Sequence, residues 1–207
     1  MVTRGRSSVR DSAATRRRIL DAVGRIIVGD GLAAVSVNAL ARAAGCDKVL
    51  IYRYFGDLSA VCAAFAKQTD FWWRLDELTD GLDPRDGLAA ALKTILRRHA
   101  SALRRRPTTL AVLAAELSQR TPLVIALEML RERRALELNA WIAGNFALPA
   151  GVDLAATMTL IGVAFNYLAA RAVSTAVMGG VDIGAESGWQ RLFVAADALI
   201  DGLLRPT

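Results

Sequence analysis

The chain has 207 residues, of which 54% are hydrophobic and 22% are charged. This balance excludes an intrinsically disordered chain, and the length is enough to bury a core without disulfide or metal support. Lysine and arginine number 26 against 20 aspartates and glutamates, and most of the excess lies in the first 60 residues. A basic first quarter indicates a polyanion partner for the N-terminal part, although an Arg-rich solvated surface would give the same excess.

Composition also limits the chemistry. Cys46 and Cys62 form no CxxC pattern and have no histidine nearby, so we expect no disulfide, no metal site and a reduced, cytoplasmic setting. With one histidine and no GxSxG, HExxH or phosphate-loop motif, the sequence offers no nucleophile–base pair and an enzyme is disfavoured. Residues 154–170 carry no charge, but Thr157 and Asn166 are costly in lipid, so a core or interface helix is expected rather than a membrane span.

The first elements in chain order are short. Residues 1–11 are polar and Arg-rich and predict a flexible basic arm. A helix is expected over about residues 12–28, because its apolar positions share one helical stripe: Ile19, Ala22, Val23, Ile26 and Ile27. Ser36 is a good N-cap for a helix that ends before Gly45, and Asp47 is a good N-cap for a third helix over 48–55.

Longer helices follow, separated by proline and glycine. They are expected over residues 57–79, 86–106, 107–119, 122–145, 153–177 and 185–204. The predicted fold is therefore all-α, with about nine helices and no internal repeat.

The second and third helices, joined by the turn at 45–47, form a helix-turn-helix pattern. In such a pair the second helix enters the major groove of DNA. Ile51 can face the core while Lys48, Tyr52 and Arg53 face outward, which suits contacts with phosphates and base edges. Ordinary partial burial would explain the tyrosine equally well.

The segment 31–55, with its YRYF sequence after the turn, resembles the TetR/AcrR family of transcriptional regulators, and the resemblance covers about residues 12–66. It implies an arm at 1–11, a DNA-binding domain at 12–56 and a ligand-binding and dimerisation domain at 57–207. The implied phosphate contacts are made by Ser36, Tyr52 and Tyr54. The implied base contacts are made by Asn38, Lys48, Val49 and Arg53, and Leu50 either contacts a thymine methyl group or fills a gap.

In this family the second domain is a helical cavity for a small molecule, and ligand and DNA favour different states of the protein. The expected lining is Trp72, Trp73, Leu96, His99, Leu113, Glu116, Leu117, Trp141, Phe165 and Asn166. Each of these residue types, taken alone, more often belongs to an ordinary core. An apolar or aromatic ligand is expected, with an anionic one as the alternative through Arg131 or Arg134.

The last two long helices carry apolar residues at alternating spacings of four and three. These are Leu154, Met158, Ile161, Phe165 and Leu168 in one helix and Leu192, Ala196 and Leu199 in the other. Such spacing is typical of helices that pack at shallow angles, within one chain or between two. The resemblance implies a homodimer through a four-helix bundle, which would bind a palindromic double-stranded DNA operator.

These observations predict a cytoplasmic, DNA-binding transcriptional regulator that uses no cofactor. The expected mechanism is repression, with release from the operator by a small apolar or aromatic ligand. The alternative is a DNA-binding regulator without a small-molecule ligand, an activator or a constitutive repressor, whose cavity is filled by its own side chains.

Overall fold

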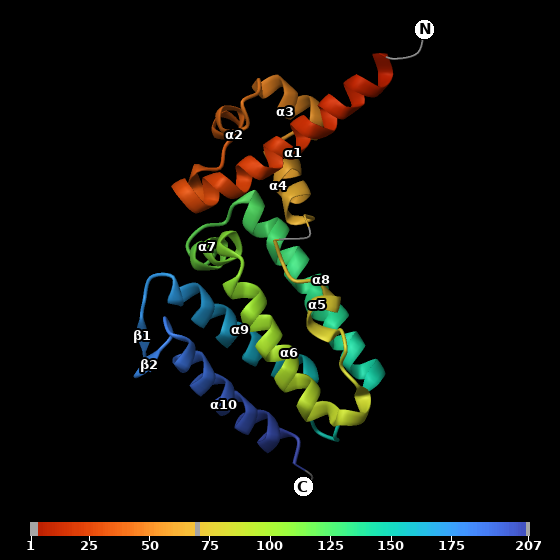
Figure 1. Ribbon diagram of the computed structural model, residues 1–207, viewed down its shortest axis with the longest axis vertical. Coiled ribbons are helices and arrows are strands. Elements are labelled where there is room, and N and C mark those ends of the chain that lie inside the picture. The colour runs from red at the N-terminus through yellow and green to blue at the C-terminus, as the bar shows by residue number, and fades with distance from the viewer. Residues whose placement is uncertain (1–3, 69–70, 206–207) are drawn as a thin grey trace. The chain divides into compact units, whose positions relative to one another are not determined.

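The computed structural model describes residues 4–68 and 71–205, with the side chains from residue 12 onward (Figure 1). Ten α-helices lie within these ranges, together with two short 3-10 helices (Leu32–Ala34 and Pro84–Asp86). The helices are α1 (Arg4–Asp30), α2 (Val37–Ala44), α3 (Lys48–Phe55), α4 (Leu58–Ala66), α5 (Leu75–Thr79), α6 (Gly87–Arg104), α7 (Pro107–Ala115), α8 (Pro122–Asn145), α9 (Leu154–Ala172) and α10 (Glu186–Leu203). The all-α prediction is confirmed.

Two compact units make up the chain. The first comprises residues 1–71 and 115–130, and the second comprises residues 72–114 and 131–207. In the first unit α1 packs against α2, α3 and α4. The predicted stripe of α1 is buried in full: Ile19, Ala22, Val23, Ile26 and Ile27. This burial orients the helix-turn-helix pair, because both short helices lie against one long support.

The helix α1 begins at Arg4, where the sequence predicts a flexible arm over residues 1–11. No proline interrupts residues 4–18, and Gly5 is the only glycine there. A helix that is already formed lengthens easily, because each added residue contributes one hydrogen bond at the cost of ordering one residue. The backbone of residues 4–11 therefore continues the packed helix, and residues 1–3 lie outside the described part of the chain.

The single helix predicted over residues 57–79 is wrong, because α4 ends at Ala66 and α5 begins only at Leu75. Three consecutive aromatic residues in the connection, Phe71, Trp72 and Trp73, are all buried. In a helix, three consecutive side chains point in directions about 100° apart and cannot all face one core. The need to bury all three therefore favours an irregular segment.

In the second unit α6 and α10 run antiparallel and are joined by ion pairs along their length. The pairs are Lys93–Asp201 at 2.5 Å, Arg97–Asp197 at 2.6 Å and Arg104–Glu186 at 2.9 Å. The residue numbers of the paired side chains rise along α6 and fall along α10, which shows that the two helices run antiparallel. One face of α10 therefore packs against α6, and the opposite face is exposed to solvent.

A β-hairpin, not predicted from the sequence, separates α9 from α10. Strand β1 (Val177–Met178) pairs with β2 (Val181–Asp182) around Gly179 and Gly180, which have φ values of 55° and 75°. Two positive φ angles in a two-residue loop match the twist of a hairpin, and glycine adopts them without strain. The predicted helix over 153–177 therefore ends early, at Ala172.

Candidate DNA-binding surface and candidate effector site

The turn between α2 and α3 is built from local capping interactions. The Ser36 Oγ accepts a hydrogen bond from the Ala39 N–H at 3.3 Å and begins α2. Gly45 ends the helix in the left-handed conformation, with φ 61° and ψ 46°. Other residues enter this conformation at a cost of roughly 1 kcal/mol, so glycine fits the position. The predicted caps of α2 are confirmed, and the turn is short and defined.

The third helix is held at both ends. The Asp47 Oδ1 accepts a hydrogen bond from the Val49 N–H at 2.8 Å, and Ile51 is fully buried. At the other end Arg16 of α1 donates from Nη2 to the Tyr54 carbonyl oxygen at 2.8 Å, and its guanidinium lies 5.0 Å from the centre of the Phe55 ring. The outward face of α3 is therefore presented by a fixed helix.

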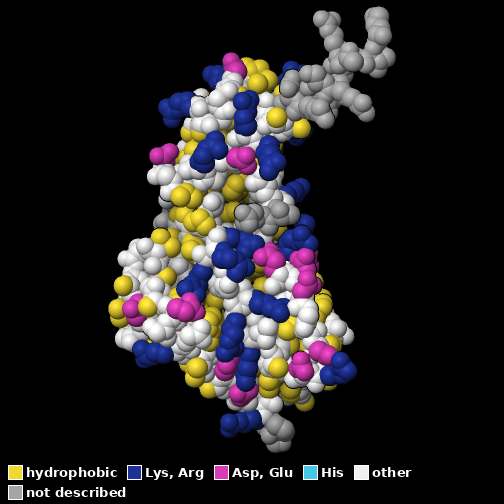
Figure 2. Space-filling model, in the orientation of Figure 1, with side chains coloured by type: hydrophobic (Ala, Val, Ile, Leu, Met, Phe, Trp, Pro, Cys, Tyr) yellow, Lys and Arg dark blue, Asp and Glu magenta, His cyan; other side chains and the backbone are white. Residues whose placement is uncertain are grey.

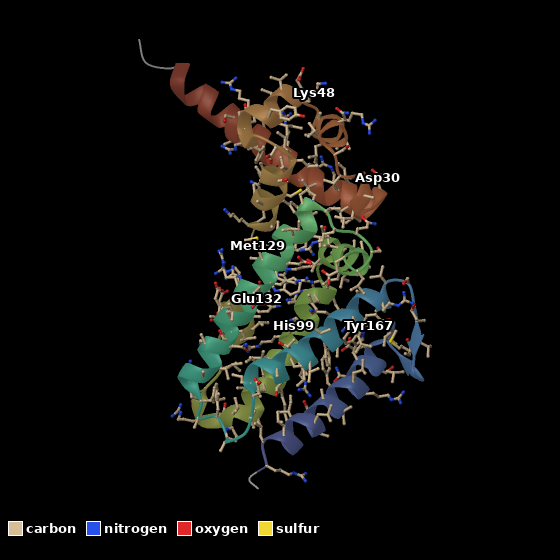
Figure 3. The ribbon with its side chains drawn as sticks, turned by 180° about the vertical axis from the view of Figure 1, so that it is seen from behind. Asp30, Lys48, His99, Met129, Glu132 and Tyr167 are labelled. Carbon is tan, nitrogen blue, oxygen red and sulfur yellow. The ribbon has the colours of Figure 1, made fainter. Side chains whose placement is uncertain are left out.

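All eight residues predicted to contact DNA lie at the surface of this pair of helices. Ser36, Asn38, Lys48, Val49, Tyr52 and Arg53 are exposed, and Leu50 and Tyr54 are half-buried. Figure 3 labels Lys48 at the start of α3, and Figure 2 shows dark blue basic side chains on the visible face of this unit. Apolar and basic side chains on one fixed helix face match the mixture of contacts that base edges and phosphates require.

Arg42 on α2 is a further exposed cation beside this surface, and sequence analysis did not select it. Its place in the last turn of α2 also suits the negative end of the helix dipole, so its charge alone does not signal a partner. The signal that could have found it is its position one turn before the helix-turn-helix turn.

The second unit contains a buried aromatic cluster formed by Trp72, Trp73, His99 and Asn166. The ring centres of the two tryptophans are 6.0 Å apart, and that of His99 is 6.3 Å from Trp72 and 5.9 Å from Trp73. The His99 Nε2 is 2.9 Å from the Asn166 Oδ1, which can only accept, so Nε2 carries the proton. Burial lowers the pKa of His99 to about 4, and the cluster is uncharged at neutral pH.

This cluster unites four of the ten residues predicted to line an effector cavity. Leu96 and Leu113 are buried, whereas Phe165 stacks on Phe193 of α10 with ring centres 5.7 Å apart. Trp141 packs instead against Phe146, at 5.9 Å between ring centres. Glu116 and Leu117 belong to the first unit, and Leu117 is strongly exposed. The predicted lining is therefore distributed among several environments.

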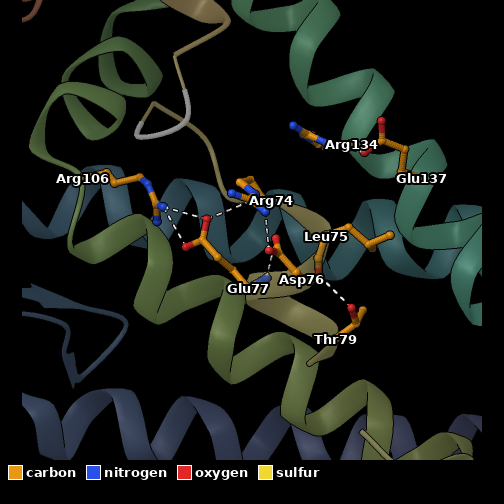
Figure 4. A network of polar contacts seen from close by, with 8 residues as sticks. All are labelled: Arg74, Leu75, Asp76, Glu77, Thr79, Arg106, Arg134 and Glu137. Atoms are coloured by element: carbon orange, nitrogen blue, oxygen red, sulfur yellow. Dashed lines mark hydrogen bonds and ion pairs between the residues drawn. The ribbon is translucent and has the colours of Figure 1, made fainter. Parts of the chain in front are cut away.

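An open pocket of about 470 Å³, also in the second unit, was missed by sequence analysis. It is lined by Arg74, Leu75, Asp76, Thr79, Asp80, Arg134, Glu137 and Trp141. Its charges are largely paired: Arg74 with Asp76 at 2.5 Å and Arg134 with Glu137 at 2.6 Å (Figure 4). The two groups of lining residues are about sixty positions apart, so no sequence pattern predicts that they meet. Within the described ranges, no three His, Cys, Asp or Glu side chains cluster as metal ligands would.

The residues predicted for the dimer seam are mostly buried or half-buried in the single chain. Leu154, Phe165 and Ala196 are buried, and Met158, Ile161, Leu168 and Leu192 are half-buried, so that only Leu199 is exposed among the eight predicted residues. A regular spacing identifies residues that pack, but not whether the partner is the same chain. The outward apolar residues are instead Leu160, Val163 and Tyr167 on α9 and Val194, Leu199 and Leu203 on α10.

The helix α9 is apolar around most of its circumference. This feature of the sequence could have predicted a second, outward apolar face. By length and composition it could cross a membrane, but only 22% of its most apolar window is buried in the chain. One such helix is weak evidence for a membrane span, because helices in cores and interfaces have the same composition. The large exposed apolar side chains, Leu160 at 74% and Leu199 at 70%, mark a surface suited to a partner.

The fold and the surface around α3 define a helix-turn-helix protein with a separate helical second unit. A family model described as "Bacterial regulatory proteins, tetR family" matches residues 19–62, which include α2, α3 and most of α4. This match confirms the predicted resemblance to the family over the helix-turn-helix region.

Two curated relatives, from different strains of Mycobacterium tuberculosis, are described as uncharacterized HTH-type transcriptional regulators. Each is 31% identical over 93 residues, which is 44% of this chain and 46% of the relative. The chain thus matches about half the length of these relatives. The family and these relatives are transcriptional regulators, not enzymes.

Solved structures share the fold over nearly the whole chain. The fatty acid degradation regulator FadR from Bacillus halodurans has a TM-score of 0.63 at 19% identity, covering 91% of this chain and 99% of that one. NalD from Pseudomonas aeruginosa, the secondary repressor of a multidrug efflux pump, has a TM-score of 0.61 at 17% identity, covering 95% and 100%. FadR from Bacillus subtilis, solved with stearoyl-CoA, has a TM-score of 0.59 at 18% identity, covering 91% and 97%.

Proposed function

We propose that this chain is a DNA-binding transcriptional regulator, a repressor that a small apolar or aromatic ligand releases from its operator. The observation that carries the proposal is the α2–α3 surface, where all eight predicted contact residues are accessible on a pair of capped and anchored helices. The protein acts in the cytoplasm, on double-stranded DNA, and needs no cofactor for this role.

In the proposed complex α3 enters the major groove with its N-terminal residues toward the bases. Lys48, Val49 and Arg53 contact base edges from α3, together with Asn38 from α2, and Leu50 contacts a thymine methyl group. Ser36, Tyr52 and Tyr54 hold phosphates on either side of the groove. Phosphate contacts position the protein, and the base contacts supply the sequence preference.

The proposed assembly is a homodimer formed through α9 and α10. The outward apolar side chains of these helices, among them Leu160, Val163 and Leu199, can be buried only against a partner. Ala195, Ala198 and Gly202 on the exposed side of α10 allow two copies to approach closely. A two-fold dimer presents two copies of α3 about 34–36 Å apart and so binds a palindromic operator.

The proposed effector site includes the aromatic cluster. Buried rings around an uncharged histidine suit an apolar ligand, and ligand and DNA oppose each other when each favours a different state. A repressor of an efflux pump and a regulator solved with an acyl-CoA share this fold, which supports a ligand-responsive repressor here. The alternative is a regulator whose tryptophans simply fill the cavity.

Fluorescence anisotropy on DNA from upstream of the protein's own gene, against scrambled DNA over a salt series, tests this function. We expect a preference for the upstream DNA that persists at physiological salt, because base contacts do not depend on released counterions. Equal binding to both DNAs, lost steeply with salt, would indicate phosphate contacts alone and contradict sequence-specific regulation from this site.

A further inference from the structure

The two tryptophans of the aromatic cluster have buried indole N–H groups without acceptors. Trp72 is 5% exposed and Trp73 is 4% exposed, and neither Nε1 has a hydrogen-bond partner among the residues that the structure describes. A buried donor left without an acceptor destabilises the fold, so such groups are rare in native proteins. Two in consecutive residues mark a place where a ligand that carries an acceptor would bind favourably.

Elsewhere in the same unit a buried indole is satisfied. The Nε1 of Trp189 donates to the Ile183 carbonyl oxygen at 2.8 Å, although Trp189 is as deeply buried as the other two. Trp189 therefore provides an internal standard for a tryptophan with a purely structural role. It also shows that the second unit can supply a backbone acceptor where packing alone decides the position.

The polar groups of the cluster cannot supply the missing acceptor in their present arrangement. The Asn166 Oδ1 accepts from His99 Nε2, and the imidazole ring meets the indole planes edge-on at 64° and 79°. The guanidinium of Arg131 lies 5.9 Å from the centre of the Trp72 ring and can only donate. With the proton on Nε2, the His99 Nδ1 is an acceptor, but neither indole N–H donates to it, so the cluster has more donors than acceptors.

We infer that the effector is an uncharged molecule with a carbonyl oxygen on an apolar body, and that Trp72 and Trp73 donate their indole N–H groups to it. The inference rests on the proposed function, because it gives the chemistry of the ligand for that effector site. The neutral His99 supports an uncharged ligand, since it offers no positive charge to a buried carboxylate, and the nearby Arg131 has interactions of its own. The aromatic walls pack against the apolar body.

Acetophenone and ethylbenzene test the inference as probes, because they differ only by a carbonyl group in place of a methylene. Their dissociation constants are measured on the full chain and on Trp72→Phe, Trp73→Phe and the double variant. The quantity of interest is the carbonyl preference, the ratio of the ethylbenzene constant to the acetophenone constant. Comparing this ratio between variants cancels the different solubilities of the two probes.

We expect the carbonyl preference to fall about tenfold in each single variant, since one hydrogen bond in a buried site contributes about 1–1.5 kcal/mol. The double variant should lose more than either single variant. Trp189→Phe, the matched control, should retain the preference of the unaltered chain. As a measurement independent of variant folding, acetophenone should move the indole N–H resonances of Trp72 and Trp73, but not that of Trp189, in a proton–nitrogen NMR spectrum.

Four results would overturn the inference: no binding of acetophenone, a preference that is unchanged in the double variant, indole resonances that do not move, or tighter binding of phenylacetate than of acetophenone. Specific DNA binding is measured on the same samples. If it is present while the inference fails, the regulator proposal stands and the rings are structural. If specific DNA binding is absent from the unaltered chain, the proposed function itself fails.

Discussion

The two units of the chain differ in how far apart their defining contacts lie in the sequence. In the first unit, the helix-turn-helix pair is shaped by caps that act over two or three residues, at Ser36 and Asp47. In the second unit, the defining contacts join residues tens of positions apart, such as His99 with Asn166. Local contacts specify the helix-turn-helix pair, which lies in the region that the family model matches, whereas long-range contacts assemble the aromatic cluster.

The largest effect is expected from disrupting the proposed dimer. Val163→Glu places a charge on the outward face of α9, where Val163 is 59% exposed in the single chain. We expect monomers and a loss of operator affinity of at least about hundredfold, because two linked helix-turn-helix units bind far more tightly than one. Sedimentation velocity and anisotropy on the same operator measure both effects.

Val177→Glu is the matched control for this prediction. Val177 lies on β1, outside the two helices, and its exposure of 58% is nearly the same. It should leave both the dimer and the operator affinity close to those of the unaltered chain. A Val163→Glu protein that remains dimeric would show that the α9–α10 face is not the interface.

The next effect tests the long-range contacts of the second unit (Figure 4). The Arg106 Nη2 donates to both carboxylate oxygens of Glu77, at 2.9 and 2.7 Å, and the Arg106 side chain is 10% exposed. Glu77→Gln removes the negative charge while retaining an acceptor for the Arg74 N–H. We expect a loss of about 2 kcal/mol in unfolding free energy, because the largely buried Arg106 loses a charge-assisted hydrogen bond.

Glu128→Gln, in the exposed pair with Arg120, is the control for Glu77→Gln and should cost less than about 1 kcal/mol. Urea denaturation of the three proteins provides the comparison. Equal losses for the two substitutions would mean that burial does not distinguish these ion pairs.

A smaller effect concerns pH. Burial lowers the pKa of His99 from 6.5 to about 4, so below pH 6.5 the unfolded chain binds a proton that the folded chain rejects. This contribution to stability is complete above pH 6.5 and is lost as the pH falls toward 4. Between pH 7 and pH 5 we expect a loss of about 2 kcal/mol.

Because His99 is the only histidine, His99→Gln should remove this part of the pH dependence. The carboxylates titrate equally in both proteins, so they cancel in the comparison. Parallel stability curves for the two proteins between pH 7 and pH 5 would contradict a neutral, buried His99.

The sequence predicted α2 and α3 to the residue, because Ser36, Gly45 and Asp47 are signals that act on their own neighbours. It did not predict the break after Ala66, because residues 67–74 contain neither proline nor glycine. The break follows from burying three aromatic residues in a row, which depends on what packs around them. The capping residues could be recognised in the sequence, whereas the packing around the aromatic residues could not.

The candidate sites follow the same division. All eight predicted DNA contacts lie at the surface of the α2–α3 pair, whereas four of ten predicted effector residues share the aromatic cluster. The apolar stripe predicted that Phe165 is buried. It could not show whether the side chain would contact a ligand or, as the structure has it, Phe193. Likewise, the spacing on α9 identified the face that packs within the chain and missed Leu160 and Val163 on the other.

The most direct test of the account compares Arg53→Ala with Tyr52→Phe on an operator panel with one base pair changed at a time. We expect Tyr52→Phe to weaken binding to every sequence alike, by about tenfold or less, because it removes a phosphate contact. Arg53→Ala should instead relax the preference at one base position, because it removes a base contact worth about 1–3 kcal/mol of discrimination. An equal loss on every sequence for Arg53→Ala would contradict the base-contacting role of α3.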